Sequence, residues 1–172
     1  MIKPLIVMVA ICLTVAVLLG LTNSVTAPII EENTRKLEEE TRISVLEGAQ
    51  SFTQIECDEE ALGITGAYRE DNGKGYVITA ANKGYGGLVT VTVGLDDSGK
   101  IVGLSANVST ETSGVGSKAG KSDYTDKFIG LTGNCDSVDK ISNATYSSTA
   151  VKTGVNAALS AFETVKQGGA VK

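Results

Sequence analysis

The chain contains no histidine and no tryptophan, and its aromatic residues are few: three Phe and five Tyr. The lack of histidine excludes His-based catalytic triads, histidine general bases and most catalytic zinc sites. The scarcity of aromatic rings argues against a platform that stacks nucleic-acid bases and against an aromatic cage around a ligand. Any chemistry must therefore come from carboxylates, hydroxyls, backbone amides or a bound cofactor.

The chain also lacks an excess of basic residues. Its 15 Lys and Arg stand against 20 Asp and Glu, which gives a net charge of −5 and a pI of about 4.8. Binding of nucleic acid requires a concentrated basic face, so this composition excludes nucleic acid as a partner. With a membrane segment subtracted, 172 residues leave room for one further domain.

Only three cysteines are present, and no two are close in sequence. Cys12 lies in an apolar run, where packing is its expected role, and the large Ile11 before it disfavours a lipoprotein site. Cys57 and Cys135 could form a disulfide if their domain is exported. Redox and metal roles are less favoured, and we predict no metal site.

Charge is almost absent from the first 24 residues. Lys3 precedes an uncharged, mainly apolar stretch from Pro4 to Thr22, close to the roughly 20 residues needed to cross a bilayer. A cleaved signal peptide is the rival interpretation, with Val25–Ala27 as a small-residue site, but the apolar run exceeds the usual length of about 7–15 residues. We therefore expect an uncleaved transmembrane anchor over residues 1–24. Lys3 predicts a cytoplasmic N-terminus, a single pass through the cytoplasmic (inner) membrane and a domain on the extracytoplasmic side.

Residues 25–60 are rich in good helix formers and are expected to form a juxtamembrane helical stalk. Pro28 suits a first helical turn, and Gly48 suits a helix end. The acidic residues between them are interpreted as a solvated helix face, not as a metal site.

Patterns typical of β-strands begin at Leu62. Two strand-like runs flank Asn72-Gly73, a strong hairpin signal. From Leu88, alternating Val and Thr lead into an Asp-Asp-Ser-Gly turn at 96–99 and a further strand. These features predict half-buried antiparallel strands.

Two helices are expected after the strands. The first is short and is predicted to be capped by Ser122. The second begins near Ser147 and carries an apolar stripe of Val151, Val155, Ala158, Leu159 and Phe162. The predicted fold is α+β: a single N-terminal transmembrane helix and a stalk helix, followed by a compact domain of antiparallel sheet plus helices over residues 61–172.

Three stretches rich in glycine or hydroxyl residues interrupt these elements: NKGYGG at 82–87, ETSGVGSKAG at 111–120 and ISNATYSS at 141–148. Each alone is typical of a surface loop. The second lacks the Gly-Lys-Ser/Thr ending and the strand-to-helix setting of a phosphate loop, which disfavours a nucleotide-dependent phosphotransferase. The third supplies more hydroxyls than one helix cap requires.

Taken in order, the three stretches resemble the FMN-binding domain of the G subunit of the Rnf electron-transport complex, a domain also found in the C subunit of the sodium-pumping NADH:quinone reductase. The resemblance covers roughly residues 62–165, and the single N-terminal span and the chain length favour the Rnf protein. In this family the third motif reads Ser/Thr-Gly-Ala-Thr, and its threonine carries FMN through a phosphoester. The residue that matches it here is Thr145. The second motif, which borders the flavin, maps to Glu111, Thr112, Ser113, Gly114, Val115 and Gly116.

The resemblance implies roles for the residues around Thr145. A phosphate there would lie at the N-terminal turn of the last helix, where free amides stabilise an anion. Ser142, Ser147 and Ser148 could donate to its oxygens, and the small Ala144 would leave room for close approach. In the family a magnesium-dependent flavin transferase moves FMN from FAD onto this threonine and reads an upstream aspartate, matched here by Asp139.

Two positions depart from the family pattern. Asn143 replaces the motif glycine, and Ser113 replaces a proline of the second motif. Asparagine is the non-glycine residue that best tolerates a positive φ, so the turn can be kept. Covalent FMN is expected, with noncovalent FMN or an empty site as alternatives.

The resemblance implies an electron-relay subunit, in which FMN links iron–sulfur carriers and other flavins during ferredoxin/NAD redox chemistry coupled to ion transport. Its partners would be the other membrane and peripheral subunits of the complex. Thr145 would be an attachment point and not a catalytic nucleophile, since the chain has no His to activate it. Two alternatives remain open: a membrane-anchored scaffold domain without a cofactor, and a standalone extracytoplasmic flavin reductase.

Overall fold

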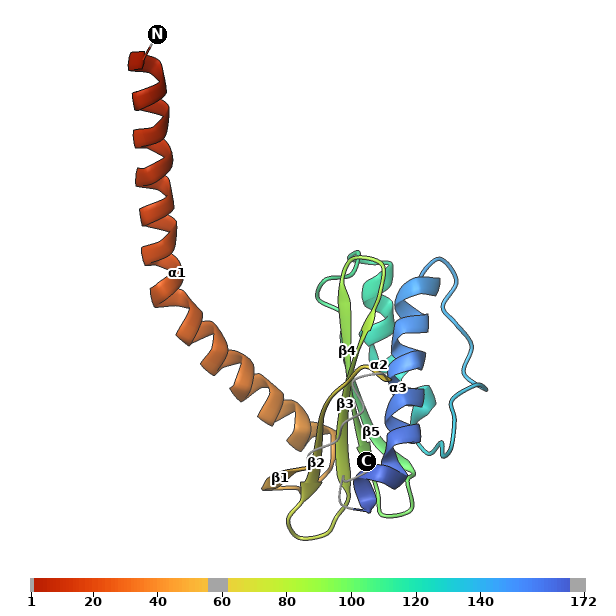
Figure 1. The fold of residues 1–172 in the computed structure, drawn as a ribbon. Helices are drawn as coiled ribbons and strands as arrows, with labels where there is room; N and C mark the ends of the chain where they lie inside the picture. Colours follow the sequence, from red (N-terminus) through yellow and green to blue (C-terminus); the bar gives the residue numbers. More distant parts are fainter. Residues whose placement is uncertain (1, 56–61, 168–172) are drawn as a thin grey trace. The chain divides into compact units, whose positions relative to one another are not determined.

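The N-terminal helix α1 runs from Ile2 to Val45 in the computed structural model, which describes residues 2–55 and 62–167 (Figure 1). Within these residues, α1 is the one helix that is long and apolar enough to cross a membrane. Its apolar side chains are open to the surroundings, and Met8 and Leu19 are each 65% exposed. Such a continuous apolar surface suits lipid, because water would penalise it.

The expected helix start at Pro28 is wrong, because α1 passes through Pro28 without interruption. A proline inside a helix removes one backbone hydrogen bond, and the residues on both sides continue the helix. The polar part that follows includes an exposed ion pair between Glu32 and Lys36, four residues apart, with a nitrogen–oxygen distance of 2.7 Å. The described chain divides into two units, Met1–Glu40 and Thr41–Lys172.

The second unit is built on an antiparallel sheet with the strand order β1-β2-β3-β4-β5. The strands are β1 (Phe52–Ile55), β2 (Ile64–Glu70), β3 (Tyr76–Lys83), β4 (Leu88–Leu95) and β5 (Ile101–Asn107). The two predicted turns join β2 to β3 and β4 to β5, as expected. β1 was not expected, since it lies in the segment assigned to the helical stalk and pairs Phe52 with Glu70 of β2.

Helix α3 (Thr145–Lys166) covers one face of this sheet and packs along β3 and β4 (Figure 1). All five residues of the predicted apolar stripe are buried in the core that α3 shares with the sheet, and Val151, Val155 and Ala158 have no exposed surface. Full burial of a Val, Leu or Phe side chain in this stripe stabilises the folded state by roughly 1.5–3 kcal/mol. This packing fixes where α3 begins, and therefore where Thr145 lies.

The opposite face of the sheet receives the last turn of α1. Val45, Leu46 and Ala49 pack against Val77 in a second apolar cluster. A Cβ atom at Gly94 or at Gly103 would lie 2.1 Å from the carbonyl oxygen of Val45. Glycine in these two strands therefore allows the helix end to lie directly on the sheet.

Between β5 and α3 the chain forms the 3₁₀ helix η2 (Gly116–Gly120), the short helix α2 (Ser122–Thr125) and the 3₁₀ turn η3 (Asp126–Phe128). Ser122 is the first residue of α2 and not its cap, which is Lys121 and forms no side-chain capping bond. Phe128 is fully buried in the main core. Cys135 is buried too, while Cys57 lies outside the described residues, so their pairing stays a prediction.

Candidate functional site

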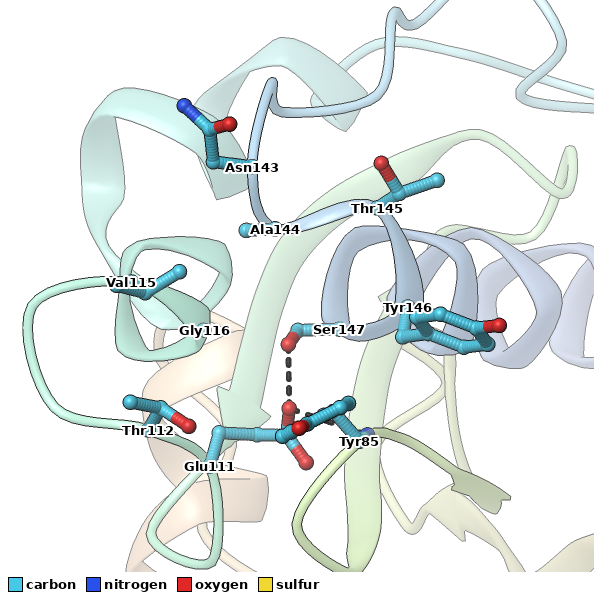
Figure 2. Close-up of a pocket in the computed structure, with 10 residues that line it drawn as sticks. All are labelled: Tyr85, Glu111, Thr112, Val115, Gly116, Asn143, Ala144, Thr145, Tyr146 and Ser147. Carbon is cyan, nitrogen blue, oxygen red and sulfur yellow. Dashed lines mark hydrogen bonds between the residues drawn. The ribbon is translucent and has the colours of Figure 1, made fainter.

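The three glycine- and hydroxyl-rich stretches converge on one cavity of about 220 Å³ (Figure 2). The first contributes the loop between β3 and β4, the second the loop after β5, and the third the turn into α3. The lining residues are Tyr85, Glu111, Thr112, Val115, Gly116, Asn143, Ala144, Thr145, Tyr146 and Ser147. Residues up to 62 positions apart in sequence, Tyr85 and Ser147, thus line a single site.

Glu111 connects the three stretches at the base of this cavity. Its side chain is only 7% exposed. The carboxylate accepts hydrogen bonds from the backbone N–H of Tyr85 at 3.3 Å and from the hydroxyl of Ser147 (Figure 2). It also accepts one from the backbone N–H of Gly86 at 2.9 Å. These bonds hold the loop of Tyr85 and Gly86 against the start of α3.

The glycines of the motifs allow the backbone to approach this carboxylate. A Cβ at Gly84 would lie 2.5 Å from Oε1 of Glu111, and one at Gly116 would lie 2.6 Å from Oγ of Ser147. A side chain at either position would displace the acceptor or its donor. The glycine content of the first two motifs therefore has a packing reason at this carboxylate.

Burial by itself would raise the pKa of Glu111, because a low-dielectric environment disfavours the charged form. The hydrogen bonds from Ser147, Gly86 and Tyr85 outweigh that effect, so the pKa lies below its ordinary value. Glu111 is therefore an anion at neutral pH. Its charge is balanced by these donors, since a buried carboxylate requires such partners.

The turn into α3 depends on Asn143, whose φ is +67°, the one positive φ of a non-glycine residue in the described parts of the chain. The left-handed conformation expected for the motif glycine is thus kept by asparagine, as predicted. Ala144 is the N-cap residue of α3, and no side chain caps this helix end within the described residues. The first amides of a helix have no partner inside it, so the start of α3 presents free donors.

Thr145 is the first residue of α3, and it is exposed at the wall of the cavity (Figure 2). Ser147, two residues on, is buried and donates its hydroxyl to Glu111. Ser148 is also buried, and its hydroxyl bonds to the carbonyl oxygens of Ala144 at 2.8 Å and Thr145 at 3.2 Å. The hydroxyls of this motif are therefore divided: Ser142 and Thr145 are exposed, while Ser147 and Ser148 are buried.

Eight of the predicted cofactor-binding residues line the cavity: Glu111, Thr112, Val115, Gly116, Asn143, Ala144, Thr145 and Ser147. Ser142, Ser148 and Gly114 do not. Ser148 donates its hydroxyl to the helix backbone and does not line the cavity. Gly114 and Ser142 are exposed and lie outside the lining. Asp139, assigned to recognition by a flavin transferase, is exposed as well and does not line the cavity.

Sequence reasoning missed two lining residues, Tyr85 and Tyr146. Tyr146 could have been found from helical periodicity, since it lies five positions before Val151 and so falls off the buried stripe. The same periodicity places Ser147 four positions before Val151, on the buried side. For Tyr85, the sequence signal is only its place in the Gly-Tyr-Gly-Gly turn.

Comparison with known proteins identifies the class of this site. Residues 84–160 match the FMN-binding domain family, and this span contains all ten lining residues. The part of the chain that forms the site is therefore similar to an FMN-binding domain.

Two curated relatives are similar to this chain over most of its length. The chain is 22% identical over 167 residues to the G subunit of the proton-translocating ferredoxin:NAD(+) oxidoreductase complex of Clostridium ljungdahlii, covering 91% of this chain and 89% of that protein. It is 28% identical over 177 residues to the G subunit of the Na(+)-translocating ferredoxin:NAD(+) oxidoreductase complex of Acetobacterium woodii, covering 87% of this chain and 85% of that protein. The resemblance to the Rnf G subunit that the three motifs indicated is confirmed.

Proposed function

We propose that this chain is the electron-relay subunit of a membrane-bound ferredoxin:NAD oxidoreductase complex, and that it carries FMN through a phosphoester on Thr145. The observation that carries the proposal is the position of Thr145. Its hydroxyl-bearing side chain is exposed, forms part of the cavity wall and is the first residue of a 22-residue helix without a side-chain cap.

The residues present suit a phosphate at this position. The free amides at the start of α3 and the positive end of the helix dipole stabilise an anion, worth roughly 0.3–1 kcal/mol for an exposed charge. Ala144 keeps the approach open, because its side chain is small and only 4% exposed. The main negative charge nearby, Glu111, is occupied by its own donors and lies at the base of the cavity.

When bound, FMN would accept two electrons and release them one at a time. The chain's own residues bind and position it. Glu111 holds the loop of Tyr85 and Gly86 against the start of α3. This arrangement fixes the cavity walls before a cofactor arrives, so that little conformational entropy is lost on binding.

The remaining subunits of the complex are the proposed redox partners, and α1 is the proposed membrane anchor. In the proposed orientation the N-terminus is cytoplasmic, which places the FMN domain on the extracytoplasmic side. A separate flavin transferase is the proposed maturation partner, with the exposed Asp139 as part of the surface that it recognises. The proposed orientation is tested by fusing alkaline phosphatase after Lys172. This enzyme becomes active only outside the cytoplasm, so the fusion is expected to be active in cells.

The attachment is tested by comparing two variants in a host that attaches flavin. Thr145→Ala is expected to abolish flavin fluorescence of the chain on a denaturing gel. Thr112→Ala removes another exposed hydroxyl from the same cavity wall and is expected to keep the fluorescence. Fluorescence that persists in Thr145→Ala would contradict the attachment site. A colourless wild-type chain would instead favour the scaffold alternative, and steady-state reductase activity of the isolated chain would favour the standalone reductase.

A further inference from the structure

Tyr85 and Tyr146 are unusual among the aromatic residues of this chain because their side chains are 73% and 70% exposed. The other six aromatic side chains are buried or half-buried: Phe52, Tyr68, Tyr76, Tyr124, Phe128 and Phe162. Single exposed apolar side chains are ordinary, but large ones that gather at one place usually mark a contact surface. Both exposed rings line the same cavity, the one that contains Thr145.

The two rings come from different elements and are held near one another. Their centroids are 6.2 Å apart and their planes are inclined by 49° (Figure 2), a separation within the range of interacting aromatic pairs, about 4.5–7 Å. The backbone N–H of Tyr85 donates a hydrogen bond to the Glu111 carboxylate, and its loop is closed by the hydrogen bond from Gly84 N–H to the Gly87 carbonyl at 2.8 Å. Tyr146 is held by the first turn of α3.

The size of the cavity limits what can lie inside it. Its volume of about 220 Å³ is below the roughly 300–1,000 Å³ typical of sites that enclose a small ligand. A flavin nucleotide has a phosphate, a ribityl chain and a planar three-ring system. With its phosphate at Thr145, the planar ring must extend toward the mouth of the cavity, since the base is closed by Glu111 and Ser147.

We propose that Tyr85 and Tyr146 form the apolar surface on which the planar ring of the flavin lies; the proposal rests on the proposed FMN site. They are positioning residues for the ring end of the cofactor, while α3 serves its phosphate end. The low aromatic content argued against an aromatic platform, but two rings placed at one cavity suffice. Because the ring lies at the mouth and not in the interior, its outer edge stays accessible to a partner that exchanges electrons with it.

Titration with two ligands tests this proposal. The full-length chain is prepared in detergent from a host without a flavin-attaching enzyme, and FMN and riboflavin are each titrated by flavin fluorescence. Riboflavin lacks the phosphate, so it reports on the ring end alone. The variants are Tyr85→Ala, Tyr146→Ala, Tyr85→Phe and Tyr146→Phe. Leu88→Ala is the matched control, because Leu88 is 62% exposed three residues from Tyr85 but lies outside the cavity lining.

Each alanine variant is expected to raise the Kd for FMN and for riboflavin by about tenfold, as loss of one stacking contact predicts. The ratio of the two Kd values should stay unchanged. The phenylalanine variants and Leu88→Ala should bind within about twofold of wild type, since the ring is kept or was never in contact.

The failures are distinguishable. If wild type binds flavin and the alanine variants match it, the tyrosine surface is refuted while the FMN site stands. If Phe and Ala variants weaken binding equally, the hydroxyls and not the rings make the contact, which also overturns the proposal. If wild type binds neither FMN nor riboflavin in detergent and carries no flavin after expression with a flavin-attaching enzyme, the proposed function itself fails.

Discussion

Replacement of Glu111 with glutamine is expected to lower the free energy of unfolding by about 2 kcal/mol at neutral pH. Glu111 is 7% exposed and accepts hydrogen bonds from Gly86, Tyr85 and Ser147. Glutamine keeps the shape of the side chain but removes its charge. Bonds to a charged acceptor contribute roughly twice as much as neutral ones, so each of the three loses about 1 kcal/mol. Burial of the neutral glutamine amide costs less free energy than burial of the carboxylate, and this difference offsets part of the loss from the three hydrogen bonds.

The matched control is Asp96→Asn. Asp96 also accepts three hydrogen bonds, from the N–H and hydroxyl of Ser98 and from the N–H of Lys100. It lies in a surface turn, where water can replace the lost interactions. We therefore expect Asp96→Asn to cost less than about 1 kcal/mol.

The difference between wild type and Glu111→Gln should depend on pH. The pKa of Glu111 is lower in the folded protein than its usual value of 4.5. The stabilisation by its charge is therefore fully present above pH 4.5 and is lost as the pH falls through the folded-state pKa. Two urea titrations in detergent, at pH 7 and at about pH 3, measure this difference. Equal midpoints for wild type and Glu111→Gln at pH 7, or an equal loss in Asp96→Asn, would refute the anchoring role of Glu111.

Three further predictions concern the same domain. Asn143→Ala should destabilise it by about 1 kcal/mol and Asn143→Gly should not, because φ is +67° and alanine resists that conformation; equal urea midpoints would contradict this. Gly86→Ala would place a Cβ 2.1 Å from the Thr110 carbonyl oxygen and should cost more than about 2 kcal/mol, whereas Gly73→Ala, with open space around it, should cost about 1 kcal/mol. Burial raises the pKa of the Cys135 thiol, so maleimide should modify it slowly in the folded chain and rapidly in urea, as mapped by peptide mass spectrometry; equal rates would show that Cys135 is accessible.

Local signals were sufficient to predict the elements that carry the site. The alternating Val and Thr residues of β4 and the apolar stripe of α3 reflect burial on one face, and both elements formed as expected. The turn at Asn143 was also predictable, because asparagine has an intrinsic tolerance of positive φ. By contrast, β1 has only four residues and lies in a polar segment, too short for an alternating pattern to be detected.

The interior of the site was not predictable in the same way. Glu111 joins residues 25 and 36 positions away, and no pattern within one segment encodes such a meeting. The serines of the third motif were expected to serve a phosphate, yet Ser147 faces Glu111 and Ser148 faces the helix backbone. Helical periodicity could have shown this orientation. Ser147 and Ser148 lie four and three residues before Val151, so both continue the buried stripe of α3.

Attachment of FMN to Thr145, at the start of α3, is the central proposal, and peptide mass mapping tests this attachment most directly. The chain is purified from its native host and digested, and the peptide that covers Asp139–Val151 is sequenced by mass spectrometry. A mass increase of FMN less one water, located on Thr145, is the predicted result. An unmodified peptide from a colourless protein would contradict the account, because the cavity would then have a role other than holding flavin.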